Sequence, residues 1–137
     1  GHVVSYERRA DFLDVARRNA EDFFGKVPAW LDLRHGDVRE VATTGETFQR
    51  VLLDLPEPRA VLDEVGAALV AGGILATYLP TTGQVQETVA AMRGAGFAEV
   101  ETFEVLLRTW HVEPRSVRPD HRMVAHTGFV TVGRKTS

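Results

Sequence analysis

The sequence predicts a single layered α/β domain over residues 1–137, built on a mostly parallel sheet. Segments with helical spacing of apolar residues alternate along the chain with short apolar segments typical of strands. The run Val51-Leu52-Leu53 shows no alternation of polar and apolar residues, which is typical of a strand buried on both faces. The last two expected strands are joined through a long loop, so we expect them to form an antiparallel pair.

The first third of the chain predicts two strands around one helix. Apolar residues fall at helical spacing between Phe12 and Phe23, and Gly25 ends that helix. Trp30 to Arg34 alternates as a strand does. The expected elements are a strand at 3–6, a helix at 8–24, a strand at 30–34, a turn at 35–38 and a polar connection at 43–49.

The rest of the chain continues the alternation after the strand at 51–54. Gly72-Gly73 is expected to close a helix and to open the next strand, and Thr81 or Thr82 caps a helix that Gly96 ends. The expected elements are a helix at 59–70, a strand at 74–79, a helix at 82–95, a strand at 100–109, a loop at 110–124 and a strand at 127–133.

Three of the expected strands are followed by an acidic residue: Glu7, Asp37 and Asp54. In a doubly wound sheet these strand ends lie on one edge, above the crevice where nucleotide-like ligands bind. A carboxylate only accepts hydrogen bonds, which suits the hydroxyl groups of a ribose or the amino group of a base. The alternative is that Glu7 is a solvated loop carboxylate and that Asp54 caps a turn.

Asp54 stands out because Pro56 and Pro58 follow it closely. Proline fixes its own φ and lacks an amide proton, so the two prolines end the strand and stiffen the loop. The sequence therefore predicts a carboxylate held on a rigid turn at the ligand-binding edge. A glycine-rich phosphate loop is missing after the first expected strand, and Gly72-Gly73 is no substitute because it precedes a strand.

Composition limits the possible classes of protein. The chain has no cysteine, which rules out disulfides and thiolate metal sites and fits a reducing compartment. No apolar run approaches the length of a membrane span. The net charge is −3, yet residues 108–137 hold six Arg or Lys against two acids. This asymmetry permits a polyanion-facing surface at the C-terminal end.

Several motifs together resemble the catalytic domain of the bacterial and archaeal tRNA (adenine-58-N1)-methyltransferases. The similarity extends over essentially the whole chain, and its last motif is long and specific. The residues that carry it are Val4-Ser5-Tyr6-Glu7, Asp54-Leu55-Pro56-Glu57-Pro58, Ala76-Thr77-Tyr78-Leu79-Pro80, Trp110 and Arg118-Pro-Asp-His-Arg-Met-Val-Ala-His-Thr-Gly-Phe129.

The resemblance implies a class I S-adenosylmethionine methyltransferase fold, which is Rossmann-like, and a role for four residues. Glu7 would bind the ribose of S-adenosylmethionine, and Asp37 its adenine. Asp54 would lie between the methyl donor and the target base, and Tyr78 would contact or position that base. The alternative for Tyr78 is an amphipathic residue at the end of a strand.

The resemblance also implies that a β-rich domain, a first strand and a glycine-rich cofactor loop precede Gly1. No turn or methionine precedes the strand at 3–6, so we expect the chain to be part of a longer protein and, alone, to bind the cofactor poorly and to be inactive. In that fold the missing strand lies between the strands at 3–6 and 51–54. These two would therefore pair directly, leave a gap, or accept a strand from another copy.

The resemblance implies tRNA as substrate, a cytoplasmic location and a homotetramer, with no membrane and no metal. The stretches 100–109 and 127–133 are expected subunit contacts. Arg115, Arg118 and Arg122 are candidates for contacts with RNA phosphates, and an interface or solvated loop is the alternative.

The spacings of His111, His121 and His126 match no compact zinc pattern. Two further functions stay open. One is a non-catalytic fragment for oligomerisation or RNA binding, and the other is a class I methyltransferase that acts on another substrate. The motif at 118–129 argues against the last.

Overall fold

The structure is a computed structural model that describes all residues, Gly1–Ser137, and the chain forms two compact units, Gly1–Glu46 and Thr47–Ser137. The prediction of a single domain therefore stays a prediction, and each unit is described by itself. No helix is long and apolar enough to cross a membrane.

The first unit is a parallel strand pair with one helix. Its elements are β1 (Val3–Glu7), α1 (Ala10–Phe24), β2 (Leu31–His35) and the short 3-10 helix η1 (Val38–Thr43). β1 pairs with β2 in parallel, with Glu7 opposite His35. Gly25 ends α1 in the left-handed region at φ 80°, a conformation that glycine adopts without strain. The two strands and the helix lie where the sequence predicted them.

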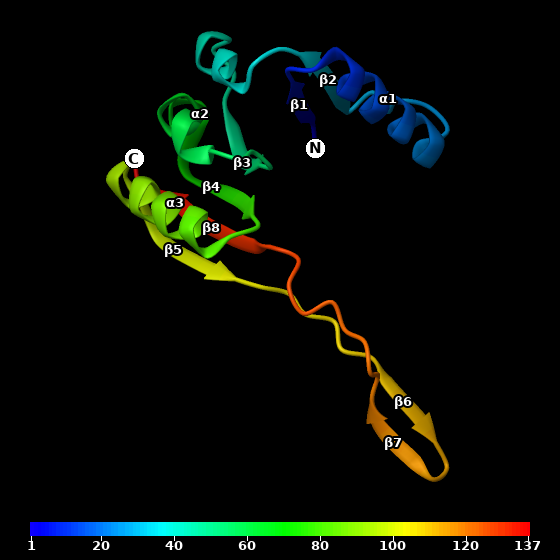
Figure 1. The fold of residues 1–137 in the computed structure, drawn as a ribbon. Coiled ribbons are helices and arrows are strands. Elements are labelled where there is room, and N and C mark those ends of the chain that lie inside the picture. The colour runs from blue at the N-terminus through cyan, green and yellow to red at the C-terminus, as the bar shows by residue number, and fades with distance from the viewer. The chain divides into compact units, whose positions relative to one another are not determined.

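The second unit is a four-stranded sheet in the order β3-β4-β8-β5 (Figure 1). β3 and β4 are parallel, whereas β8 is antiparallel to both β4 and β5. Three strands therefore run in one direction and β8 runs against them, which confirms a mixed sheet with an antiparallel C-terminal pair. The elements of this unit's body are β3 (Phe48–Leu53), the 3-10 helix η2 (Pro58–Val61), α2 (Leu62–Ala68), β4 (Leu69–Leu79), α3 (Thr82–Gly94), β5 (Phe97–Phe103) and β8 (Phe129–Lys135).

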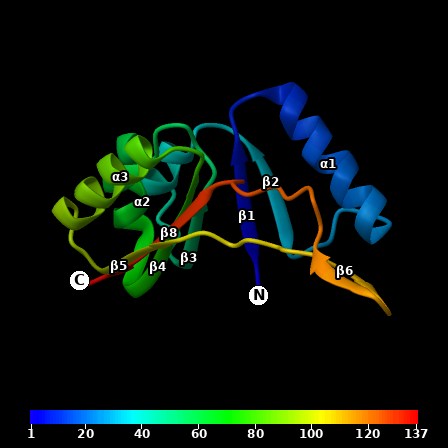
Figure 2. The same cartoon turned by 60° about the horizontal axis from the view of Figure 1, so that its bottom comes forward.

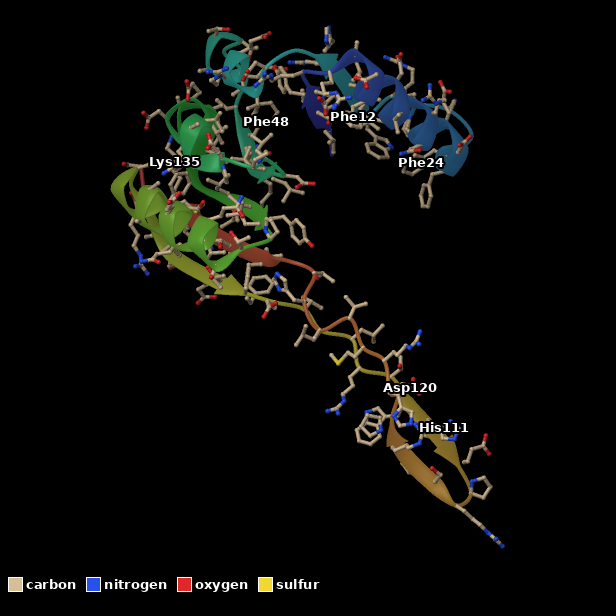
Figure 3. All side chains as sticks on the ribbon, in the orientation of Figure 1. Phe12, Phe24, Phe48, His111, Asp120 and Lys135 are labelled. Atoms are coloured by element: carbon tan, nitrogen blue, oxygen red, sulfur yellow. The ribbon has the colours of Figure 1, made fainter.

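The core of the second unit lies between the sheet and two helices. α2 and α3 cover one face of the sheet (Figure 2). Alternate residues of β4 point to that face, and Leu75 and Leu79 are fully buried there. Met92 of α3 and Val65 of α2 complete this core. Lys135, at the end of β8, donates from Nζ to the carbonyls of Gly66 and Leu69 at 2.6 and 2.8 Å (Figure 3).

Two glycines change the expected boundary between α2 and β4. The helix was expected to continue to residue 70, but α2 ends at Ala68 and β4 begins at Leu69. Gly72 has a φ of +75°, and a Cβ on Gly73 would come 2.8 Å from the Val70 carbonyl. The pairing with β3 shifts register at this point. Gly72-Gly73 therefore forms an irregularity inside a strand, and the prediction that it closes a helix was wrong.

The predicted loop at 110–124 was also partly wrong. It contains a hairpin of β6 (Trp110–Glu113) and β7 (Ser116–Pro119), which Figure 3 shows with His111 and Asp120 labelled. The Asp120 amide donates to the Thr109 carbonyl at 3.0 Å, and the Thr109 hydroxyl bonds the Asp120 carboxylate. β5 ends at Phe103, not at residue 109, because its partner β8 begins only at Phe129.

Smaller differences concern strand boundaries and the edge of the sheet. β3 begins at Phe48 and β8 runs over 129–135, both displaced from the expected ranges. β1 and β3 belong to separate sheets. Because these strands belong to different units, the three expected arrangements of the strands at 3–6 and 51–54 stay predictions. β3 pairs only with β4, and Leu52 on β3 is 70% exposed.

Candidate functional site

The first unit places Glu7 and Asp37 at one edge of its strand pair. Glu7 is the last residue of β1, and Asp37 lies two residues after β2. The Gly36 amide donates to the Glu7 carbonyl at 3.0 Å, which holds the two strand ends together. The Glu7 carboxylate accepts from the Arg9 amide at 2.8 Å, at the start of α1. The two acids are thus neighbours at the carboxyl edge, as the sequence predicted for parallel strands.

Asp37 also has a structural role. It is the N-cap of η1, and Glu40 completes a capping box by accepting from the Asp37 amide at 2.9 Å. Its two carboxylate oxygens accept from the Arg39 guanidinium at 3.0 and 2.7 Å. These side-chain bonds, with a further bond from the Arg39 amide and the nearby Arg8, hold the pKa of Asp37 far below its ordinary value. Asp37 is therefore ionised at neutral pH, and a ligand amino group would share it with Arg39.

Asp54 follows β3 in the second unit, as expected. Leu53, the last residue of β3, is opposite Thr77 in parallel register, so Asp54 and Tyr78 each directly follow this last pair of the two adjacent strands. The Gln84 side chain of α3 donates to the Pro56 carbonyl at 3.1 Å. This bond and the two prolines fix the loop that begins with the exposed Asp54.

Tyr78 lies on a glycine. Its ring packs so closely on Gly128 that a Cβ there would come 2.6 Å from the Tyr78 hydroxyl oxygen. Tyr78 is opposite Val130 across β4 and β8, and it remains 37% exposed. The hydroxyl end of the ring therefore packs against the backbone at Gly128, while part of the side chain stays exposed. Such a ring can stack on a flat ligand and can hydrogen-bond to it.

A histidine joins the chain segments around Tyr78. The Nε2 atom of His126 lies 2.7 Å from the Pro80 carbonyl oxygen, and its Nδ1 atom lies 2.6 Å from Oε1 of Glu104. From the sequence, His126 was weighed as a metal ligand with His111 and His121, which their spacings did not support, and Gly128 had no role. His126 and Gly128 both belong to the motif at 118–129, whose length was the signal, although spacing alone did not reveal what these residues contact.

Neither a deep pocket nor a cluster of metal ligands accompanies these residues. A cavity of about 170 Å³ lies behind the Asp54 loop, lined by Pro56, Glu57, Pro58, Arg59, Gln84, Glu87 and Thr88. It is smaller than the roughly 300–1,000 Å³ of usual small-molecule pockets. No group of three or more His, Cys, Asp or Glu residues is placed to hold a metal ion.

The four predicted site residues thus form two pairs. Glu7 with Asp37 belongs to the first unit, and Asp54 with Tyr78 belongs to the second. The acceptors of the first pair fit the hydroxyl and amino donors of a nucleoside. That all four residues bind one cofactor and one substrate stays a prediction.

Comparison with protein families gives a match over most of the chain. A family model described as tRNA methyltransferase complex GCD14 subunit matches residues 1–127. The tRNA (adenine(57)-N(1)/adenine(58)-N(1))-methyltransferase TrmI of Methanocaldococcus jannaschii is 31% identical, with 98% of this chain and 56% of that protein covered. The tRNA (adenine(58)-N(1))-methyltransferase TrmI of Thermus thermophilus is 33% identical, with 98% and 52% covered. The chain spans about half the length of the curated relatives it matches.

Two solved structures share the fold over the whole chain. A SAM-dependent O-methyltransferase of Thermotoga maritima has a TM-score of 0.90 at 33% identity, and this chain covers 51% of it. The tRNA (m1A58) methyltransferase TrmI of Aquifex aeolicus has a TM-score of 0.87 at 26% identity, with 54% covered. These matches confirm the class I S-adenosylmethionine methyltransferase fold, and the chain belongs to the TrmI and GCD14 family of tRNA adenine-N1 methyltransferases.

Proposed function

We propose that this chain carries catalytic residues of an enzyme that methylates N1 of adenine 58 in tRNA. The observation that supports this most directly is that Asp54 and Tyr78 each directly follow Leu53 and Thr77, the last paired residues of the adjacent strands β3 and β4, in a chain of this family. A carboxylate next to an exposed aromatic ring suits a flat base that carries an amino group. The Thermus relative is named for adenine 58, and the Methanocaldococcus relative for adenines 57 and 58.

Glu7 and Asp37 are the proposed holders of the cofactor. Glu7 would accept hydrogen bonds from ribose hydroxyls and Asp37 from the adenine amino group. When bound, S-adenosylmethionine supplies an electrophilic methyl group. Asp54 is the third proposed cofactor-binding residue, because it follows the next strand of the predicted edge.

Asp54 would act on the target base through its amino group. N1 of a neutral adenine carries no proton, so its attack needs no strong base. By accepting a hydrogen bond from the N6 amino group, Asp54 would increase electron density at N1 and would stabilise the cationic product. Catalysis would then rest on positioning and electrostatics.

Tyr78 would hold the target base after the base has left its stack in the folded RNA. Its ring packs against Gly128 and the side chain stays 37% exposed, which supports stacking or a hydrogen bond from the hydroxyl. Arg115, Arg118 and Arg122 are proposed contacts to RNA phosphates, which would add affinity without sequence information.

Assembly into a homo-oligomer is part of the proposal, with a tetramer as the expected form. Large apolar side chains are exposed between β5 and β8, including Leu107, which is 80% exposed. Exposed apolar patches of this kind mark protein interfaces. The same observation favours the alternative of a non-catalytic assembly fragment. The likeness to the Thermotoga O-methyltransferase keeps a second alternative, a class I enzyme with another substrate.

The test compares two proteins: this chain alone, and this chain joined to the part of the Methanocaldococcus relative that it does not cover. Each is titrated calorimetrically with S-adenosylmethionine and then assayed on a tRNA transcript with adenine 58. The control transcript carries guanine 58. We expect the joined protein to bind the cofactor and to methylate only the adenine 58 transcript, while the chain alone does neither.

Three other results would change the proposal. Tight binding by the chain alone would mean that the acids at 7, 37 and 54 suffice, against the expected impairment. Equal labelling of both transcripts would exclude adenine 58 as the target. Cofactor binding without transfer to either transcript would favour another substrate, and no binding by either protein would favour the assembly fragment.

A further inference from the structure

The ring of His126 lies between two hydrogen-bond acceptors. Nδ1 is 2.6 Å from Glu104 Oε1, and Nε2 is 2.7 Å from the Pro80 carbonyl oxygen. A carbonyl and an ionised carboxylate accept hydrogen bonds and donate none. A neutral imidazole has a single N–H and can donate to one of them. Only the doubly protonated ring donates to both, so this geometry fits an imidazolium.

His126 connects three chain segments that leave the sheet at one end. Pro80 directly follows β4, Glu104 directly follows β5, and His126 precedes β8, which lies between them (Figure 1). The His126 ring also packs on Phe129, with ring centroids 4.8 Å apart. The three segments are brought together by one side chain.

This connection lies next to the Tyr78 ring. Tyr78 is two residues before Pro80, and Gly128 is two residues after His126. The bond from His126 to Pro80 therefore fixes the segment that carries Gly128 against the segment that carries Tyr78. A shift of either segment would open the close packing of the Tyr78 ring on Gly128.

We propose that His126 is a positioning residue for Tyr78: as an imidazolium held by Glu104 and by the Pro80 carbonyl, it keeps the Tyr78 ring on Gly128. What Tyr78 then does to a substrate rests on the proposed function. The positioning itself does not, because it concerns contacts inside this chain.

The proposal gives a pH dependence with a definite sign. Glu104 is the charged group that faces His126 from the β5 side, the Pro80 carbonyl is a neutral acceptor on the β4 side, and Phe129 is the contact on its own segment. The hydrogen bond to Glu104, followed by the one to Pro80, raises the pKa of His126 above its ordinary value. The imidazolium of His126, which donates from both ring nitrogens, is thus fully present below the ordinary pKa of about 6.5. It is lost as the pH rises through the raised pKa.

The experiment is NMR on the intact chain labelled with ¹⁵N-histidine and ring-¹³C-tyrosine. Tyr78 is assigned with a Tyr6→Phe variant, because the chain has two tyrosines. We expect both ring nitrogens of His126 to be protonated at pH 6, and we expect the Tyr78 ring signals to titrate with the same midpoint as His126. In Glu104→Gln both midpoints should move together to lower pH.

Matched variants separate positioning from general effects on the fold. His126→Gln should shift the Tyr78 signals at pH 6 and abolish their titration, whereas His121→Gln, an exposed histidine of the same segment, should leave both unchanged. Tyr78 signals that ignore the state of His126, or a His126 that is neutral at pH 6, would overturn the proposal. If His126→Gln does not fold, the Glu104→Gln titration decides.

An activity assay then separates this proposal from the proposed function. In a protein that methylates RNA, His126→Gln should lower kcat about tenfold and leave the Kd for S-adenosylmethionine within twofold of the parent value. If no RNA is methylated by any form, the proposed function fails, but the NMR result still decides whether His126 positions Tyr78.

Discussion

At the scale of single residues, Gly128 is where the site and the packing depend on the same contact. A methyl group at this position would come within 2.7 Å of three atoms of the Tyr78 side chain, so the ring would have to move. We expect Gly128→Ala to displace the ring, to destabilise the chain by about 1–3 kcal/mol through overpacking, and to lower methyl transfer at least tenfold. Urea unfolding and a transfer assay measure the two effects. Gly83→Ala is the control, since a Cβ there meets no atom within 4 Å.

Asp54 gives a second residue-scale prediction, because the proposed mechanism needs its charge as well as its shape. Asn at this position keeps an oxygen acceptor but removes the negative charge that stabilises a cationic base. We expect Asp54→Asn to lower kcat about 100-fold, in the range seen when one preorganised polar contact to developing charge is removed. Glu57→Gln in the same exposed loop should keep near-full activity. Near-full activity of Asp54→Asn or Asp54→Ala would remove the basis of the mechanism.

The sequence located the acidic residues of the site but not the residues that pack around Tyr78. An acid after each strand is a local pattern, so Glu7, Asp37 and Asp54 could be located without a structure. Gly128 and His126 could not, because their contacts with Tyr78, Pro80 and Glu104 depend on how β8 enters between β4 and β5. The spacings of the histidines matched no compact zinc pattern and gave His126 no other role, whereas the structure shows its ring within hydrogen-bond distance of a carboxylate and a carbonyl.

At the scale of elements, the end of α2 depends on a side chain from the other end of the unit's sequence. The last carbonyls of a helix lack partners within the helix, and the Lys135 ammonium supplies donors to Gly66 and Leu69. Lys135→Met keeps the length of the side chain but removes these charged hydrogen bonds. We expect a loss of roughly 2 kcal/mol in the free energy of unfolding. Lys26→Met, at the chain's other and exposed lysine, is the control and should change it little.

The elements of the chain differ in how far the sequence could predict their bounds. α1 and α3 have helical spacing and terminal glycines, and their bounds were close to the expected ones. The boundary of α2 was wrong because Gly72-Gly73 is a helix-ending pattern that here lies inside β4. The hairpin β6-β7 was missed because each of its strands has only four residues, which is too short for a clear alternating pattern. Its turn is formed by Pro114 and Arg115. Long-range pairing, not local preference, sets these elements.

At the scale of the whole molecule, the segment between β5 and β8 carries large apolar side chains that are exposed. Leu107 is 80% exposed and Val124 is 72% exposed. Burial of apolar area is the main favourable term in association, so these residues favour contact with another copy of the chain. This agrees with the expectation from the sequence that residues 100–109 take part in subunit contacts, which remains a prediction.

Sedimentation equilibrium of the chain and of two glutamate variants tests this contact. We expect the parent chain to self-associate, and Leu107→Glu to raise its dissociation constant at least tenfold, because a charge would then be buried in an apolar interface. Phe23→Glu is the matched control, since Phe23 is equally exposed at 81% but belongs to α1 in the first unit. A parent chain that stays monomeric, or two variants that weaken association equally, would show that the residues between β5 and β8 do not form the subunit contact, and assembly would then have to use another surface.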